Sequence, residues 1–162
     1  MTSTFSEAQM ITLKTINPEA IPAAIQKAKQ YRLLNEPNDA ESICLDILVT
    51  DPGHQEALKI LVLALSDKFS DHGLIPSFQQ AQKYMDMLDD SHCKRYYEGI
   101  IFERRAKFHL KQGGPGSGSV AYDFLVKAMD AFSVVLEQCD EHNQEAVLRW
   151  NSCARIINDQ PG

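Results

Sequence analysis

The sequence contains no apolar run of the roughly 18 residues that a membrane-spanning helix requires. Its first twenty residues have neither the basic start nor the apolar stretch of a signal peptide. Cysteine is sparse, and its four copies form no C-x-x-C pair: Cys44, Cys93, Cys139 and Cys153. Isolated cysteines are typical of small buried side chains in a reducing compartment rather than of a disulfide framework. We therefore expect a cytoplasmic protein.

Basic residues are fewer than acidic ones: the chain has 16 Lys and Arg against 22 Asp and Glu, which gives a formal net charge of −6. Such a balance argues against generic binding to nucleic acid or to an anionic membrane, since both need a positive field. We expect neither as a partner. The apolar fraction of 44% and the length of 162 residues suit one ordinary globular domain.

One segment departs from this acidic balance. Residues 91–111 hold two glutamates, Glu98 and Glu103, against six basic residues: Lys94, Arg95, Arg104, Arg105, Lys107 and Lys111. The first interpretation is internal pairing, in which Lys94 and Arg95 meet three aspartates at the end of the preceding helix: Asp86, Asp89 and Asp90. The second interpretation is a basic strip that receives an acidic segment of a partner. The sequence leaves both open.

Motifs that carry catalysis or bind cofactors are missing. The glycine-rich stretch 113–119 lacks the lysine of a P-loop and follows a predicted helix rather than a strand, which indicates a flexible connector. His92 and Cys93 are adjacent and so point to different sides of a helix, with no second pair at metal-ligand spacing. No G-x-S-x-G, H-E-x-x-H or EF-hand loop is present. We expect no enzyme activity, no cofactor and no metal.

A helical period runs through the rest of the chain. Three triads, each led by an alanine, repeat the same spacing of four and then three residues: Ala40/Cys44/Ile47, Ala81/Met85/Leu88 and Ala128/Phe132/Val135. Residues at this spacing share one face of a helix. No stretch alternates with period two, so the chain is predicted to be all-α. We expect a weakly ordered segment 1–16, with a short helix near residues 7–14, before one helical domain 17–158.

The spacing within residues 24–52 carries a family resemblance. It places small residues, an aromatic residue, a leading alanine and a closing proline in a fixed order: Ala24, Ala28, Tyr31, Ala40, Cys44, Ile47 and Pro52. This order resembles the tetratricopeptide repeat (TPR), a helical hairpin of about 34 residues. A second unit follows through Leu58, Leu61 and Leu65. A third begins with Gly99 and Phe102.

The resemblance implies a right-handed α-solenoid of about three irregular TPR-like hairpins. The units would span 21–54, 55–91 and 92–140, with a Gly/Ser-rich loop at 113–119 and a C-terminal capping helix at 144–157. The chain departs from the repeat because Ala24 replaces the usual tryptophan and Cys44 the usual aromatic residue. The leading alanines lie 41 and then 47 residues apart, so the repeat is irregular.

In such a solenoid the first helix of each hairpin lines the concave face. That placement makes seven residues candidates for partner binding: Lys29, Arg32, Lys59, Leu63, Tyr96, Ile100 and Arg104. The alternative is that Tyr97 and Ile100 belong to the core. Some members of the family bind a chaperone's terminal carboxylate with lysines and asparagines, but Ile25 and Ile60 stand at two of those positions here. That activity is not expected.

These features favour a non-catalytic protein–protein interaction module, a scaffold or adaptor that binds a partner peptide or helix in its groove. One alternative is a small dedicated chaperone for a single client protein. A less favoured one is a helical bundle that binds an anionic small molecule through the arginines of residues 91–111.

Overall fold

The computed structural model describes residues 10–70, 74–137 and 143–159, and every regular element in these ranges is helical. A 3₁₀ turn at Pro18–Ala20 leads into the first helix. The helices are α1 (Ile21–Leu33), α2 (Pro37–Thr50), α3 (Gln55–Asp67), α4 (Leu74–Asp86), α5 (Ser91–Gln112), α6 (Ser117–Leu136) and α7 (Asn143–Asp159). The all-α prediction is confirmed.

Capping side chains and a proline start three of the helices. Asp90 caps α5, because its carboxylate accepts hydrogen bonds from the backbone amides of His92 (2.8 Å) and Cys93 (2.9 Å). His54 caps α3 through its ring Nδ1, which accepts from the amide of Ala57 at 3.1 Å. Pro37 opens α2, where its missing N–H costs no intrahelical hydrogen bond. Local sequence therefore sets where these helices begin.

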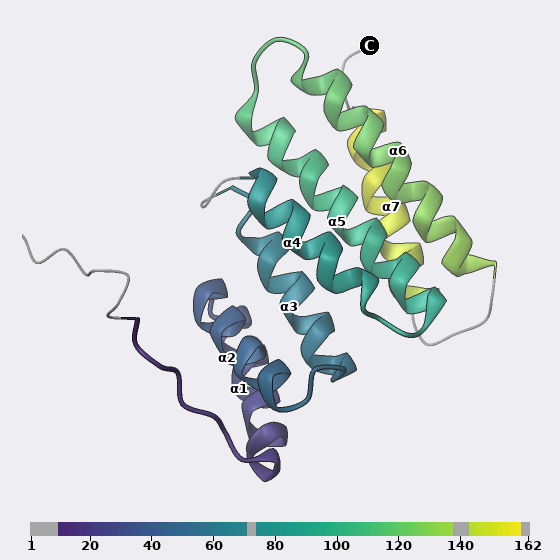
Figure 1. Ribbon diagram of the computed structural model, residues 1–162. Coiled ribbons are helices and arrows are strands. Elements are labelled where there is room, and N and C mark those ends of the chain that lie inside the picture. Colours follow the sequence, from purple (N-terminus) through teal and green to yellow (C-terminus); the bar gives the residue numbers. More distant parts are fainter. Residues whose placement is uncertain (1–9, 71–73, 138–142, 160–162) are drawn as a thin grey trace, which may run out of the picture.

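The helices pack in the order of the sequence, each against the next (Figure 1). The hairpin α1/α2 lies at one end of the molecule, α3/α4 in the middle, and α5, α6 and α7 at the other end. Helix α3 also contacts both α1 and α5, so α1, α3 and α5 are successive neighbours. None of the helices within the described ranges combines the length and apolar character that crossing a membrane requires.

The three triads point into the core. All nine of their side chains are buried, and Ala40, Ala81 and Ala128 have no exposed surface. The third hairpin shows why small residues are needed, because a Cβ atom added to Gly99 on α5 would lie 2.5 Å from the ring of Phe132 on α6. That ring is itself fully buried. Glycine therefore lets α5 and α6 approach closely.

Three segments differ from expectation. The glycine-rich connector is shorter than 113–119, because α6 already begins at Ser117. Gly113, Gly114 and Gly116 make the turn with φ between 68° and 92°, a range that favours glycine. Residues 10–16 form no helix, whereas residues 7–9 of the helix predicted there lie outside the described ranges. The predicted 144–157 helix extends to Asn143–Asp159.

The cysteines agree with the prediction of buried thiols where they are described. Cys44, Cys93 and Cys153 are buried, and burial raises the pKa of Cys44 and of Cys153 to about 12. Cys139 lies outside the described residues. The described thiols therefore act as small apolar side chains in the core.

Candidate partner-binding groove

One face of α3 lies exposed between α1 and α5 and carries two hollows. The first hollow has a volume of about 380 Å³ and is lined by Lys29, Arg32 and Leu33 of α1, Glu56, Lys59, Ile60 and Leu63 of α3, and Tyr97 of α5. Leu33 is 84% exposed at its rim. The hollow thus combines an apolar floor with basic side chains at its edge.

The second hollow continues along the same helix towards its carboxyl end. Its volume is about 410 Å³, and residues of α3, α5 and α7 line it together with the residues after α3: Ser66, Asp67, Phe69, Ser70, Glu103, Arg104, Lys107, Phe108, Lys111 and Arg149. Glu56, Leu63 and Asp67 recur at intervals of seven and four residues, which places both hollows on one face of α3. We refer to the two hollows together as the α3 groove.

Asp67 lines the second hollow and joins three helices. Its carboxylate lies 2.8 Å from Nε of Arg32 on α1 and 3.0 Å from Nη1 of Arg104 on α5. Lys29 and Glu56 form another ion pair between α1 and α3. Asp67 and its two arginines are each at most about one-third exposed, so water screens these pairs less than it screens pairs on open surface. The arginines are therefore held at the groove in fixed positions.

Glu103 makes the corresponding link between α5 and α7. Its side chain is only 2% exposed, and one carboxylate oxygen lies 3.0 Å from Nζ of Lys107 and 3.2 Å from Nη1 of Arg149. Arg149 also donates from Nε to the Tyr96 hydroxyl at 3.0 Å. A buried carboxylate is costly unless it is paired, so this network makes the position of α7 depend on α5.

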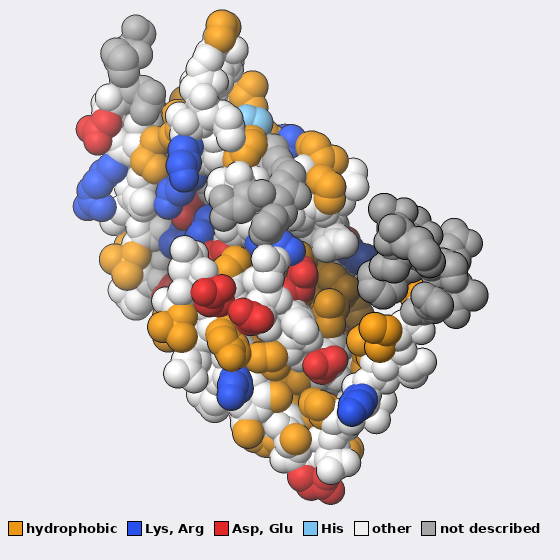
Figure 2. All heavy atoms as spheres, turned by 90° about the vertical axis from the view of Figure 1, so that its left-hand side faces the viewer, with side chains coloured by type: hydrophobic (Ala, Val, Ile, Leu, Met, Phe, Trp, Pro, Cys, Tyr) orange, Lys and Arg blue, Asp and Glu red, His pale blue; other side chains and the backbone are white. Residues whose placement is uncertain are grey.

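The groove is positive although the whole chain is acidic. Among the described residues that line them, each hollow holds two more basic than acidic side chains. The carboxylates present are already paired with cations of the groove itself. Viewed from the side, basic side chains gather in the upper part of one face, above a mixture of acidic and hydrophobic ones (Figure 2).

The pairing expected for the basic segment is only partly found. Arg95, Arg104 and Lys107 do pair internally, with Glu98, Asp67 and Glu103. However, no ion pair within the described ranges joins Lys94 or Arg95 to the three aspartates before α5, so that part of the prediction is wrong. The carboxylate of Asp90 caps α5 instead, and Lys94 reaches the backbone oxygen of Asp86 at 3.1 Å.

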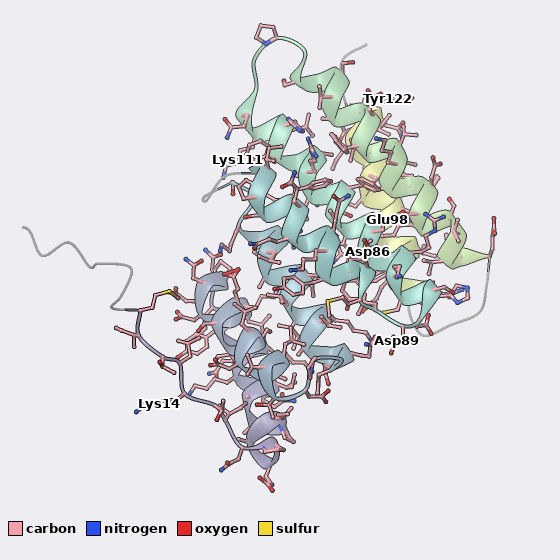
Figure 3. The ribbon with its side chains drawn as sticks, viewed as in Figure 1. Lys14, Asp86, Asp89, Glu98, Lys111 and Tyr122 are labelled. Carbon is pink, nitrogen blue, oxygen red and sulfur yellow. The ribbon has the colours of Figure 1, made fainter. Side chains whose placement is uncertain are left out.

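Lys111 has no carboxylate partner in the described part of the chain. It lies at the far end of α5 from Asp86 and Asp89 (Figure 3). Lys111 lines the second hollow, where it adds positive charge to that of the paired arginines. The basic segment is therefore neutralised in part and keeps some free charge at the groove.

Five of the seven predicted binding residues line the α3 groove. Lys29, Arg32, Lys59 and Leu63 line the first hollow and Arg104 the second. The other two, Tyr96 and Ile100, lie in the core with 4% and 1% of their surface exposed. The alternative that Tyr97 and Ile100 belong to the core is confirmed, since Tyr97 is 8% exposed, although Tyr97 also lines the first hollow.

Three residues that line the groove were not among the seven predicted for partner binding: Arg149, Glu103 and Tyr97. Arg149 stands on the final helix, which was expected only to cap the stack, and a glutamate among basic residues is usually solvated. The spacing of seven between Tyr97 and Arg104 could have identified Tyr97 as the groove residue instead of Tyr96, because residues seven apart share a helix face.

No group of three or more metal-binding side chains occurs in the part of the chain that the structure describes. Comparison of the chain with models of protein families, with curated proteins and with solved structures finds no match.

Proposed function

We propose that the chain is a non-catalytic protein–protein interaction module, a cytoplasmic scaffold or adaptor that holds a partner peptide or helix in the α3 groove. Its helices would form a TPR-like right-handed solenoid in which α1, α3 and α5 line the concave face and α7 closes the stack. The order of the hairpins, the contacts of α3 with both α1 and α5, and the burial of all three triads support this architecture.

The observation that carries the proposal is the succession of two hollows along a single face of α3, linked by Asp67, which pairs with an arginine of each. Each has the size of a typical ligand pocket. Their arginines are oriented by Asp67 and Glu103 before any partner arrives. Side chains that are already ordered lose less conformational entropy on binding, which favours affinity.

The chemistry of the groove specifies the kind of segment that it would bind. Ile60, Leu63 and Leu33 offer apolar surface in the first hollow, so an apolar side chain of the partner would bury there. The second hollow offers Lys111 and the edges of Arg104 and Arg149, which suits acidic side chains. We therefore expect an extended or helical segment with an apolar anchor followed or preceded by carboxylates.

Site-specific photo-crosslinking tests this proposal. A photoreactive amino acid at Leu63, within the first hollow, is expected to form an adduct with one defined segment of a partner in cells. The matched control carries the same group at Leu148, which is 68% exposed on α7 and does not line either hollow. A synthetic peptide of the captured segment should then bind the purified protein. Equal capture at both positions, or a peptide that does not bind, would contradict the proposal.

A further inference from the structure

Arg105 lies on α5 away from the α3 groove, between aromatic rings of the two flanking helices. Its guanidinium carbon is 4.3 Å from the ring centre of Phe78 on α4 and 4.4 Å from that of Phe124 on α6. Guanidinium groups stack favourably on aromatic rings. Both rings lie against the guanidinium, whose N–H groups point outward in its own plane and so donate hydrogen bonds at its edge.

The charge of Arg105 has no counter-ion in the described structure. The other partly buried arginines, Arg32, Arg104 and Arg149, each reach a carboxylate. Arg105 has none within the described ranges, and its buried Nε has no hydrogen-bond partner. Burial lowers the pKa of Arg105, and no nearby carboxylate opposes that effect. Burying an unpaired polar group is unfavourable, so an added acceptor would find a site that is already desolvated.

The surroundings add further cations and donors. Nζ of Lys127 lies 5.1 Å from the ring centre of Phe124 and 5.8 Å from that of Phe102, and within the described ranges it has no carboxylate partner. The His109 ring is stacked on Phe124 with an interplanar angle of 9°. The buried Nε2 atom of His109 also lacks a hydrogen-bond partner. Two cations and an unsatisfied imidazole thus surround one aromatic ring.

We propose that these residues form an oxyanion-binding site on α4, α5 and α6, with Arg105 as its centre and Lys127 as a second cation. A carboxylate or a phosphate group would accept hydrogen bonds from the edge of the Arg105 guanidinium, which is built for two-pronged contact with such anions. Lys127 would supply a second, mobile positive charge. The site uses none of the groove residues, so it is independent of the proposed function.

Nuclear magnetic resonance of the arginine side chains tests the site directly. Inorganic phosphate and succinate are titrated separately into the labelled protein, with chloride at matched ionic strength as the control. We expect the Nε–H resonance of Arg105 to shift and saturate with one or both anions, while that of Arg95, an exposed arginine paired with Glu98, stays nearly unchanged. The anion with the lower Kd identifies the preferred chemistry.

Two variants test the site without replacing Arg105, whose removal can impair folding. Lys127→Gln alters an exposed side chain and is expected to weaken anion binding by about two- to fivefold, the effect of one exposed charge pair. Arg95→Gln removes a charge from the same helix and is expected to leave the affinity unchanged. The proposal would be overturned if the Arg105 resonance does not saturate or if chloride reproduces its shift. It would also be overturned if Lys127→Gln and Arg95→Gln weaken anion binding equally. The aromatic rings would then serve packing alone.

Discussion

Replacement of Gly99 by alanine should destabilise the protein, although alanine is the better helix former. In an unconstrained helix this change stabilises by about 1 kcal/mol. At Gly99 the new Cβ would lie 2.5 Å from Cε1 of Phe132 and 2.8 Å from two further ring atoms. Overpacking of this kind costs about 1–3 kcal/mol. Phe132 is fully buried and cannot swing into solvent, so we expect a net loss of up to about 2 kcal/mol.

Urea denaturation followed by circular dichroism measures this effect. Gly118→Ala is the matched control, because Gly118 is also helical and has no atom within 4 Å of its added Cβ; it should be neutral or stabilise by up to about 1 kcal/mol. A smaller residue at position 132 should relieve the clash. The double variant Gly99→Ala, Phe132→Leu should therefore lose less free energy of unfolding than the two single variants lose together, by about 0.5–3 kcal/mol. If Gly99→Ala stabilises as much as Gly118→Ala does, the close contact of α5 with α6 is refuted.

Three further predictions concern buried ionisable groups. Glu103→Gln removes the charge that pairs with Lys107 and Arg149, so the free energy of unfolding in urea should fall by about 1–3 kcal/mol; a change below about 0.5 kcal/mol would contradict the role of this network. Burial and the nearby Arg105 lower the pKa of His109 from its ordinary 6.5. The unfolded chain then binds a proton at this site more readily, so stability should decrease as the pH falls below about 6.5, and less so in His109→Gln. Because burial raises the pKa of Cys44 and Cys153 to about 12, both should resist thiol reagents in the native protein and react after denaturation; rapid native labelling of either would contradict their burial.

The sequence predicted the helices and their inward faces because these depend on local spacing. The alanine-led triads identified buried positions correctly, because their spacing alone places them on one helix face. The glycine run was recognised as a connector between helices, but its end was misplaced, because Gly116 completes the turn and Ser117 can already begin a helix. Local signals thus give the elements more reliably than their exact ends.

The groove was predicted less completely because it depends on contacts between distant helices. Asp67 is separated by 35 and 37 residues from the arginines that it joins, and nothing in its local sequence indicates that role. The choice of Tyr96 over Tyr97 was an error of one residue, which rotates a helical position by about 100°. Glu103 resembled a solvated residue because the cations that allow its burial come partly from α7. Such pairings appear only once the helices are placed side by side.

The most direct test of the central claim measures the affinity of the crosslinked partner segment for charge-reversed variants by calorimetry. Lys59 lines the first hollow, and Lys83 is an exposed lysine on α4 that lines neither hollow. We predict that Lys59→Glu weakens binding by about tenfold, the equivalent of about 1.4 kcal/mol, whereas Lys83→Glu leaves the Kd within about twofold of the original. Equal affinities of the two variants would show that the segment does not bind in the α3 groove.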